Sequence, residues 1–359
     1  MKKSILLLAA LMPFVMFSCE KEKAEKGNGD IIGSDGKYLV KKMTMKGTIE
    51  YNGDGIDYEK YTSSQKVDAT LKFSYTEGKM SRLEASGTYG VWQDFVEYYG
   101  GKRYEEDNWK GNGNIKFTYK DNRVAAEITA QGRVWETYIE EGDNENNETW
   151  EEQGSLSGTY TLSMDDGIAI SGSGTFKSGA GRGSYTTDKI KFGYDDAGQL
   201  TRVYYEGEDE DRTEFKWENG NIVNIGWYYD DDYYYKKGSK SIIRSLFDKK
   251  KTKAAKSGSV EWANWLRVEY SNQENKSNID FARLIFTYLG GYAESGIGVF
   301  GFLGKECKNL PSKLYIDDEL FFSCEYEFNG NEAVTQIKLV AGDYFGDPET
   351  AKATINIEY

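Results

Sequence analysis

One hairpin pattern recurs along the chain and constrains its fold more than any other feature. In each copy, two apolar residues spaced by two lead through a turn containing Gly, Asn or Asp to a second segment, where two apolar residues stand three apart. The copies occupy residues 73–85, 192–205, 215–227 and 326–339. Spacing by two is typical of a half-buried strand, and spacing by three places one extra residue opposite the partner strand, as in a β-bulge. The pattern predicts an antiparallel meander of bulged hairpins.

A longer repeat overlies these hairpins in the first half of the chain. Residues 115–119 (IKFTY) follow residues 71–75 (LKFSY) at a spacing of 44, and residues 134–140 follow the similar residues 91–97 at a spacing of 43. We expect each period to hold about four strands, as in a meander of duplicated hairpins. The chain has 28 Tyr, 40 Gly and 3 Pro, a composition that suits twisted β-sheet. The expected fold class is all-β, with a long, twisted and curved antiparallel sheet.

A small helical insert is expected near residues 239–305. Apolar residues at helical spacing appear first in the basic stretch 236–256 and then more clearly over residues 281–289. Either Asn278 or Asp280 is the expected N-cap of the second helix, and the Gly-Gly pair that follows it marks the helix end. A further helical turn is expected over residues 298–305, before the strands resume.

The N-terminus has the pattern of a bacterial lipoprotein signal. Two lysines precede an apolar run, residues 5–17, that is shorter than the roughly 20 residues of a membrane-spanning helix. We predict that residues 1–18 are a signal peptide and that Cys19 carries a lipid; a spanning anchor is the alternative, which the short run disfavours. Residues 19–37 are charged and contain glycine, so they are expected to form a flexible tether. The Glu-Lys-Glu start of the tether resembles an acidic export signal, so the expected location is the cell envelope, at the outer membrane and its surface, with the lipid as membrane contact.

Charge and residue usage exclude several kinds of function. The formal net charge is −14, and it becomes −16 when the signal peptide with its two lysines is removed. Such a surface repels phosphate, so no nucleic-acid partner is expected. The chain has no histidine, which excludes Ser-His-Asp and Cys-His nucleophilic sites and imidazole zinc sites. We therefore name no catalytic residue, no metal site and no cofactor; calcium, held by carboxylates, is the one ion left open.

Two cysteines besides Cys19 are present, Cys307 and Cys324. In an oxidising envelope such a pair can form a disulfide. The alternative is two buried free thiols, and sequence spacing does not decide between them because the Cα–Cα distance is unknown. Neither cysteine is expected to be a nucleophile, since no histidine is present to activate it.

One cluster combines aromatic rings with carboxylates and is the candidate ligand-binding site. Residues 227–235 are Trp-Tyr-Tyr-Asp-Asp-Asp-Tyr-Tyr-Tyr. Aromatic faces beside hydrogen-bonding acids suit a sugar ring, and adjacent carboxylates can hold calcium. The alternative is an ordinary hairpin with the rings on packed faces and the aspartates in the turn. The residues expected to bind are Trp227, Tyr229, Asp230, Asp231, Asp232 and Tyr233.

Several motifs carry a family likeness. The unit Tyr-Asp-x-x-Gly-x-Leu-x-x-Val at residues 194–203 resembles the hairpin repeats of YD/Rhs-type proteins. Further segments resemble Bacteroidota envelope lipoproteins with a C-terminal β-rich domain of unknown function: NID at 278–280, GFLGK at 301–305 and KNLPSK at 308–313. The likeness covers residues 187–359, whereas residues 38–186 share the hairpin chemistry without a distinct motif, so we expect two β regions. The resemblance implies a twisted antiparallel sheet with a small helical insert on an envelope lipoprotein, and it supplies no catalytic residues.

Three functions agree with these features. A lipoprotein that presents its β-sheet for non-catalytic recognition of a glycan or a partner protein should show contiguous exposed aromatic rings on one face. A purely structural envelope protein should not. A carboxylate-based glycan hydrolase needs two acids about 5 Å apart for retention, or roughly 6.5–9.5 Å apart for inversion. We expect the first of these functions, and hence no enzyme activity.

Overall fold

The computed structural model describes most of the chain beyond the N-terminal segment: residues 33, 36–53, 58–97, 102–140, 148–178, 184–228, 266–290, 301–316, 318–342 and 351–359. The strands in chain order are β1 (Lys42–Gly53), β2 (Tyr58–Thr76), β3 (Lys79–Glu97), β4 (Lys102–Lys120), β5 (Arg123–Glu140), β6 (Glu148–Asp165), β7 (Ile168–Ser178), β8 (Ser184–Thr186), β9 (Ile190–Tyr194), β10 (Leu200–Tyr205), β11 (Glu208–Glu218), β12 (Asn221–Tyr228), β13 (Leu266–Glu274), β14 (Asn309–Ile316), β15 (Glu319–Phe328), β16 (Val334–Ala341) and β17 (Ala351–Glu358). One helix, α4 (Phe281–Gly290), completes the described elements.

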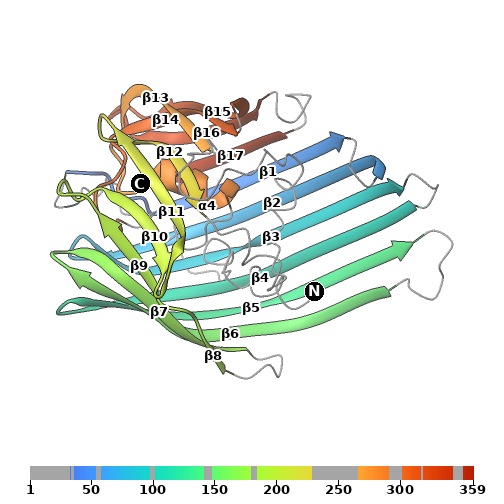
Figure 1. Ribbon diagram of the computed structural model, residues 1–359, viewed down its shortest axis with the longest axis horizontal. Coiled ribbons are helices and arrows are strands. Elements are labelled where there is room, and N and C mark those ends of the chain that lie inside the picture. Colours follow the sequence, from blue (N-terminus) through green and yellow to red (C-terminus); the bar gives the residue numbers. More distant parts are fainter. Residues whose placement is uncertain are drawn as a thin grey trace.

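All of these strands belong to one antiparallel sheet that closes on itself (Figure 1). Each strand pairs with the next one along the chain, except that β8 and β9 do not pair with each other. Strand β8 pairs with β7 alone, and β9 also pairs with β7. Strand β17 pairs with β1, which completes the ring. The predicted all-β class and antiparallel meander are confirmed. The expected boundary between two β regions falls between β8 and β9, and the sheet continues across it.

All four predicted hairpins are present, and each has a bulge in its second strand. The pairing shifts by one residue in every case, which leaves one extra residue without a direct partner: Ser81, Thr201, Val223 and Thr335. Met80 and Leu83, on either side of the first bulge, are both buried. The spacing of three in the sequence therefore reflects the bulge, which returns two residues of opposite parity to the same face.

The hairpin turns use the residues that positive φ angles favour. Asn219 and Gly220 have φ angles of 53° and 80°, as a two-residue type I′ turn requires. In the YD-like unit, the carboxylate of Asp195 accepts hydrogen bonds from the backbone N–H groups of Ala197 and Gln199, at 3.0 and 2.8 Å. These contacts are local in sequence, so they stabilise the turn from within the motif.

The 44-residue repeat contains two long strands per period, so the expectation of four strands is wrong. Residues 71–75 and 115–119 end β2 and β4, and the matching segments 91–97 and 134–140 end β3 and β5. Strands β2, β3 and β4 each have 19 residues. In Figure 1 the strands from β1 to β6 run side by side and extend to the right past the other strands. Glycines that resemble turn residues in the sequence lie inside these strands. Each period therefore forms two long strands and not four short ones.

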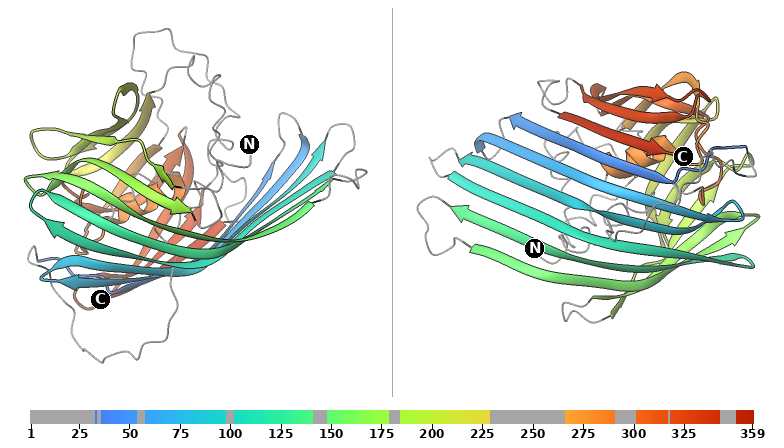
Figure 2. Two further views of the ribbon diagram at one scale, coloured as in Figure 1. Left: turned by 90° about the horizontal axis from the view of Figure 1, so that it is seen from below. Right: turned by 180° about the vertical axis from the view of Figure 1, so that it is seen from behind.

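A row of glycines crosses the middle of the long strands. Its members are direct cross-strand neighbours on β3, β4, β5 and β6: Gly87, Gly111, Gly132 and Gly154. A Cβ atom at Gly87 would lie 2.4 Å from the carbonyl oxygen of Asp68, and one at Gly132 would lie 2.9 Å from that of Lys110. Glycine therefore permits a close approach of neighbouring backbones here. Figure 2 shows these strands curving strongly along their length.

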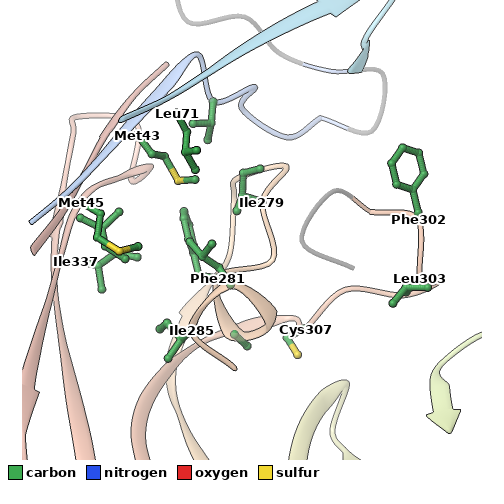
Figure 3. Close-up of a cluster of buried hydrophobic side chains, with 14 of the residues drawn as sticks. Met43, Met45, Leu71, Ile279, Phe281, Ile285, Phe302, Leu303, Cys307 and Ile337 are labelled. Carbon is green, nitrogen blue, oxygen red and sulfur yellow. The ribbon is translucent and has the colours of Figure 1, made fainter. Parts of the chain in front are cut away.

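The inner face of the closed sheet buries one apolar cluster that includes residues from both halves of the chain. Alternation along β2 defines this face, because Ala69 and Leu71 are buried whereas Asp68 is exposed. In Figure 3, Phe281 of α4 points toward Met45 of β1. The helix thus fills the interior, and its apolar residues hold the two walls of the sheet together.

The N-cap of α4 is Asp280, one of the two predicted residues. Its carboxylate accepts hydrogen bonds from the backbone N–H groups of Arg283 and Cys307, at 3.1 and 3.0 Å. The side chains of Asp280 and Arg283 are 0% and 2% exposed, and Arg283 Nε lies 3.5 Å from the carboxylate. Arg283 also donates to the backbone carbonyls of Leu303 and Lys305, at 3.1 and 2.9 Å. This buried pair fastens a distant loop to the helix.

That loop, residues 301–309, lies across several hairpin ends and is called the strap. The ring of Phe302 packs against Phe117 of β4, with centroids 5.8 Å apart. Hydrogen bonds join the strap to three further hairpins: Ala169 N–H to Phe302 O, Lys305 N–H to Gly198 O, and Lys308 N–H to Gly220 O. The strap thus connects hairpins that are far apart in sequence, and it contains the GFLGK segment singled out by the family likeness.

The helical insert agrees with the prediction in part. The helix predicted over residues 281–289 is confirmed as α4. The helical turn expected before the strands resume is wrong for residues 301–305, because their backbone groups bond to hairpin ends instead. Residues 239–265 and 291–300 lie outside the described residues. No helix in the described part of the chain is both long and apolar enough to cross a membrane.

Cys307 and Cys324 are free thiols, which decides between the two alternatives that the sequence leaves open. Cys307 is buried on the strap, and Cys324 lies on β15. Burial raises the pKa of each thiol to about 12, because a low-dielectric environment disfavours the thiolate. Both groups are therefore poor nucleophiles at neutral pH.

Candidate functional site

A polar groove crosses the outer face of the sheet above the glycine row. It has a volume of about 800 Å³ and is formed by β2 to β6. Its side chains stand in two rows, one on each side of the glycines. The first row is Asp68, Thr88, Lys110, Arg133 and Gln153, and the second is Thr70, Ser86, Asn112, Gln131 and Ser155. Together with the four glycines of its floor, these residues define the polar groove.

Strand geometry explains why these residues line up. Residues before and after each glycine point away from the core, because side chains alternate between the faces of a strand. Direct pairing places Thr88 opposite Lys110 and Lys110 opposite Arg133. Five strands spaced by about 4.8 Å make a groove about 19 Å long. An extended ligand can therefore lie across the strands and reach side chains from all five.

The polar groove offers hydrogen-bond donors and acceptors and has no apolar side chain. The amides of Asn112, Gln131 and Gln153 each donate and accept. Within the described residues, none of these three side chains makes a hydrogen bond to another group. The backbone groups of the floor are engaged in strand pairing, so the side chains are the groups free to bind a ligand.

The groove has more cationic than anionic side chains, although the chain as a whole is acidic. Asp68 is paired with Lys46 at 3.0 Å, and Arg133 donates a hydrogen bond to Glu151. Lys110 forms no ion pair with any residue that the structure describes. The groove thus contains one carboxylate, which already has a partner, and two cations.

A cluster of acids lies on the opposite, inner face beyond the glycine row. Asp107 of β4 stands directly opposite Glu136 of β5. Burial, together with the nearby charges of Glu136, Glu105 and Glu106, raises the pKa of Asp107 to about 6. The folded protein binds this proton more tightly than the unfolded chain does, so the contribution of Asp107 to stability falls as the pH rises toward 6. A hydrolase would also need two neighbouring carboxylates, but this pair does not line the polar groove.

A second cavity, of about 410 Å³, lies where the tether meets the strap. Lys37 forms an ion pair with Glu306 of the strap. Burial raises the pKa of Glu306, and the charge of Lys37 opposes that rise. The backbone N–H of Tyr38 donates to the carbonyl of Lys276 at 2.9 Å. These contacts fix the end of the tether to the body of the protein.

Five of the six predicted binding residues lie outside the described part of the chain, so the predicted cluster stays a prediction. Trp227 lies on β12, where its backbone pairs with Thr213 of β11. The other five predicted residues lie outside the described part of the chain, as does the predicted lipid-attachment residue Cys19: Tyr229, Asp230, Asp231, Asp232 and Tyr233. Within the residues that the structure describes, no group of three or more Cys, Asp or Glu side chains is arranged to hold a metal ion.

The contiguous aromatic face expected of a binder does not occur among the described residues. The large aromatic residues that are exposed there are Tyr119 and Trp150, at 36% and 37%. Tyr119 lies near the end of β4 and Trp150 near the start of β6, which places them at opposite ends of the long strands. The hydroxyl of Tyr119 is also engaged, since it donates to the carbonyl of Met80 at 2.8 Å. The two exposed rings therefore form no contiguous patch.

Sequence reasoning did not identify the polar groove. Its residues occur as ordinary polar positions between apolar ones, and each strand by itself shows only an alternating pattern. The available signal was the glycine in the middle of each long strand, such as Gly111 or Gly132. In isolation these glycines indicate turns, and only the cross-strand register aligns them.

Comparison with known proteins adds no assignment. The chain matches no protein-family model and no curated protein sequence. The groove is therefore interpreted from the chemistry of its own residues.

Proposed function

We propose that the protein is a cell-envelope lipoprotein that binds glycans without catalysis, and that the polar groove is its binding site. The observation that carries this proposal is an open groove of about 800 Å³ lined by polar side chains, with three amides that lack partners among the described residues. Sugar hydroxyls both donate and accept hydrogen bonds, as these amides do. A protein partner would require an apolar centre in the interface, and the groove offers none.

The predicted tether joins the body of the protein at Lys37, which does not line the polar groove. The proposed anchor is a lipid on Cys19 in the outer membrane, with the body of the protein at the cell surface. The tether ends at Lys37, which is held by Glu306 of the strap. The polar groove lies midway along the strands, and the far ends of β2 to β6 continue beyond it (Figure 2). A flexible tether of this length gives the groove access to the exterior.

Lipidation is expected to depend on Cys19 alone. When cells are grown with an alkyne-tagged fatty acid, the wild-type protein should carry the label, and Cys19→Ser should lose it completely. Cys324→Ser is the matched control and should remain labelled, because that residue lies on β15 in the folded domain. Labelling of the Cys19→Ser protein would contradict the proposed anchor.

Glycan binding is expected to depend on the amides of the groove. After a glycan array identifies a bound glycan, Asn112→Ala/Gln131→Ala should weaken its affinity by about tenfold or more, since each lost hydrogen bond costs about 1 kcal/mol. Isothermal titration calorimetry on the full-length protein in detergent measures this change. Thr129→Ala/Ser157→Ala is the control, because these exposed residues lie on the same face outside the groove.

Two results would contradict the proposal. One is the absence of any bound glycan on the array; the other is an equal loss of affinity in the groove variant and the control variant. The same mixtures also test the hydrolase alternative suggested by Asp107 and Glu136. A hydrolase would release reducing ends over time, whereas a binding protein leaves the glycan intact.

A further inference from the structure

The charges of the polar groove indicate which class of glycan it binds. We infer that the ligand is an anionic glycan, one that bears carboxylate or sulfate groups, and that Lys110 and Arg133 contact those groups. This inference rests on the proposed function and narrows it.

Lys110 and Arg133 occupy directly paired positions on β4 and β5. Side chains in such a pair have Cβ atoms about 5 Å apart, and like charges at this distance destabilise the sheet. Arg133 has partners within the fold, namely Glu151 and the ring of Trp135, whose centroid lies 5.5 Å from its guanidinium, whereas Lys110 has no ionic partner among the described residues. A bound anion removes this repulsion, which gives the arrangement a physical reason.

The acids around the two cations leave part of this positive charge available. Asp68, the only carboxylate of the groove, is paired with Lys46, which lies outside it. Glu151 accepts from one terminal nitrogen of Arg133, whose side chain remains 53% exposed. A guanidinium has five N–H donors, so Arg133 keeps donors for a ligand. Lys110 has no ionic partner among the described residues.

The amides stand where they can hold the uncharged part of the same sugar. Asn112 and Gln131 lie two residues along the strands from Lys110 and Arg133, on the other side of the glycine floor. A separation of two residues is about 7 Å, comparable to the width of a sugar ring. A ring lying over the glycines can therefore place its anionic group against the cations and its hydroxyls against the amides. Hydrogen bonds between charged partners are stronger than neutral ones, so the cations should dominate the affinity.

The test compares three polysaccharides that differ in charge: polygalacturonate, dextran sulfate and neutral dextran. Affinity for full-length protein in detergent is measured by calorimetry at low salt. We expect at least one of the two anionic polymers to bind at least tenfold more tightly than dextran. Lys110→Met/Arg133→Met should weaken that binding at least tenfold. Lys72→Met/Lys116→Met removes the same charge from exposed positions outside the groove and should leave binding unchanged.

The possible outcomes distinguish a failure of the anionic-glycan inference from a failure of the proposed glycan binding. Binding of one anionic polymer but not the other identifies the anionic group and supports the inference. A neutral glycan could instead bind with an affinity that Asn112→Ala/Gln131→Ala weakens and Lys110→Met/Arg133→Met leaves unchanged. In that case the proposed glycan binding stands and the anionic class of the ligand is overturned. Equal losses in the groove and control lysine variants would also overturn it, since only the net charge would then matter. If no polysaccharide binds and the glycan array is negative as well, the proposed function itself is overturned.

Discussion

Asp280→Ala should lower the free energy of unfolding by about 3–5 kcal/mol, because it removes the carboxylate that pairs with the buried charge of Arg283. The same substitution removes the N-cap of α4, which is worth about 1 kcal/mol in typical helices. It also leaves the backbone N–H of Cys307 without its acceptor. Chemical denaturation followed by tryptophan fluorescence measures the loss. Asp196→Ala, at an exposed turn position, should change stability by about 0.5 kcal/mol or less.

A double variant shows whether charge or packing causes this loss. Asp280→Ala/Arg283→Met removes both charges and should be more stable than the sum of the two single losses predicts, since no unpaired ion remains. Additive losses would indicate that the two side chains act independently. A loss below about 1 kcal/mol for Asp280→Ala would contradict the role of the pair in holding the strap to the helix.

Gly87→Ala should lower the free energy of unfolding by about 1–3 kcal/mol, the usual cost of inserting a methyl group where no space exists. Its Cβ would lie 2.4 Å from the carbonyl oxygen of Asp68 and 2.9 Å from the Cα of Ala69. Both atoms belong to the backbone of the paired strand, which cannot move without disturbing the ladder between β2 and β3. Thermal and chemical unfolding measure the effect.

Gly154→Ala is the matched control, because it lies in the same glycine row and its added methyl group would meet no other atom within 4 Å. This substitution should leave stability unchanged or raise it by about 0.4–1 kcal/mol, since alanine restricts the unfolded chain. We therefore expect a loss of stability for Gly87→Ala and none for Gly154→Ala. Equal effects would show that the close approach of the backbones does not determine the need for glycine in this row.

The local features of the fold were accessible from the sequence. The bulges at Ser81 and Thr335 were predictable because spacing within one strand reveals them. The turn at Asn219 and the cap at Asp280 were predictable because their hydrogen bonds or backbone angles involve residues within a few positions. In each case the residue type and its immediate neighbours decide the conformation, so no knowledge of distant contacts is needed.

The long-range features were not accessible in this way. The number of strands in the 44-residue repeat was wrong because mid-strand glycines such as Gly111 resemble turn residues until their cross-strand partners are known. The strap could not be predicted because Lys305 and Lys308 bond to hairpins that lie more than 80 residues away. The candidate site was missed for the same reason, since Lys110 and Arg133 become neighbours only when β4 pairs with β5.

From the sequence one could derive the strand period, the bulges, the turns, two candidates for the cap of α4 and the absence of histidine chemistry. These properties depend on residue type and short-range spacing, which the chain carries in any conformation. The tertiary structure alone decided that the sheet closes, that the strap joins its hairpin ends and that two rows of polar residues face one another across glycine. These properties depend on the register between strands, which is selected by the burial of one face over the whole sheet. The polar groove is a product of that register.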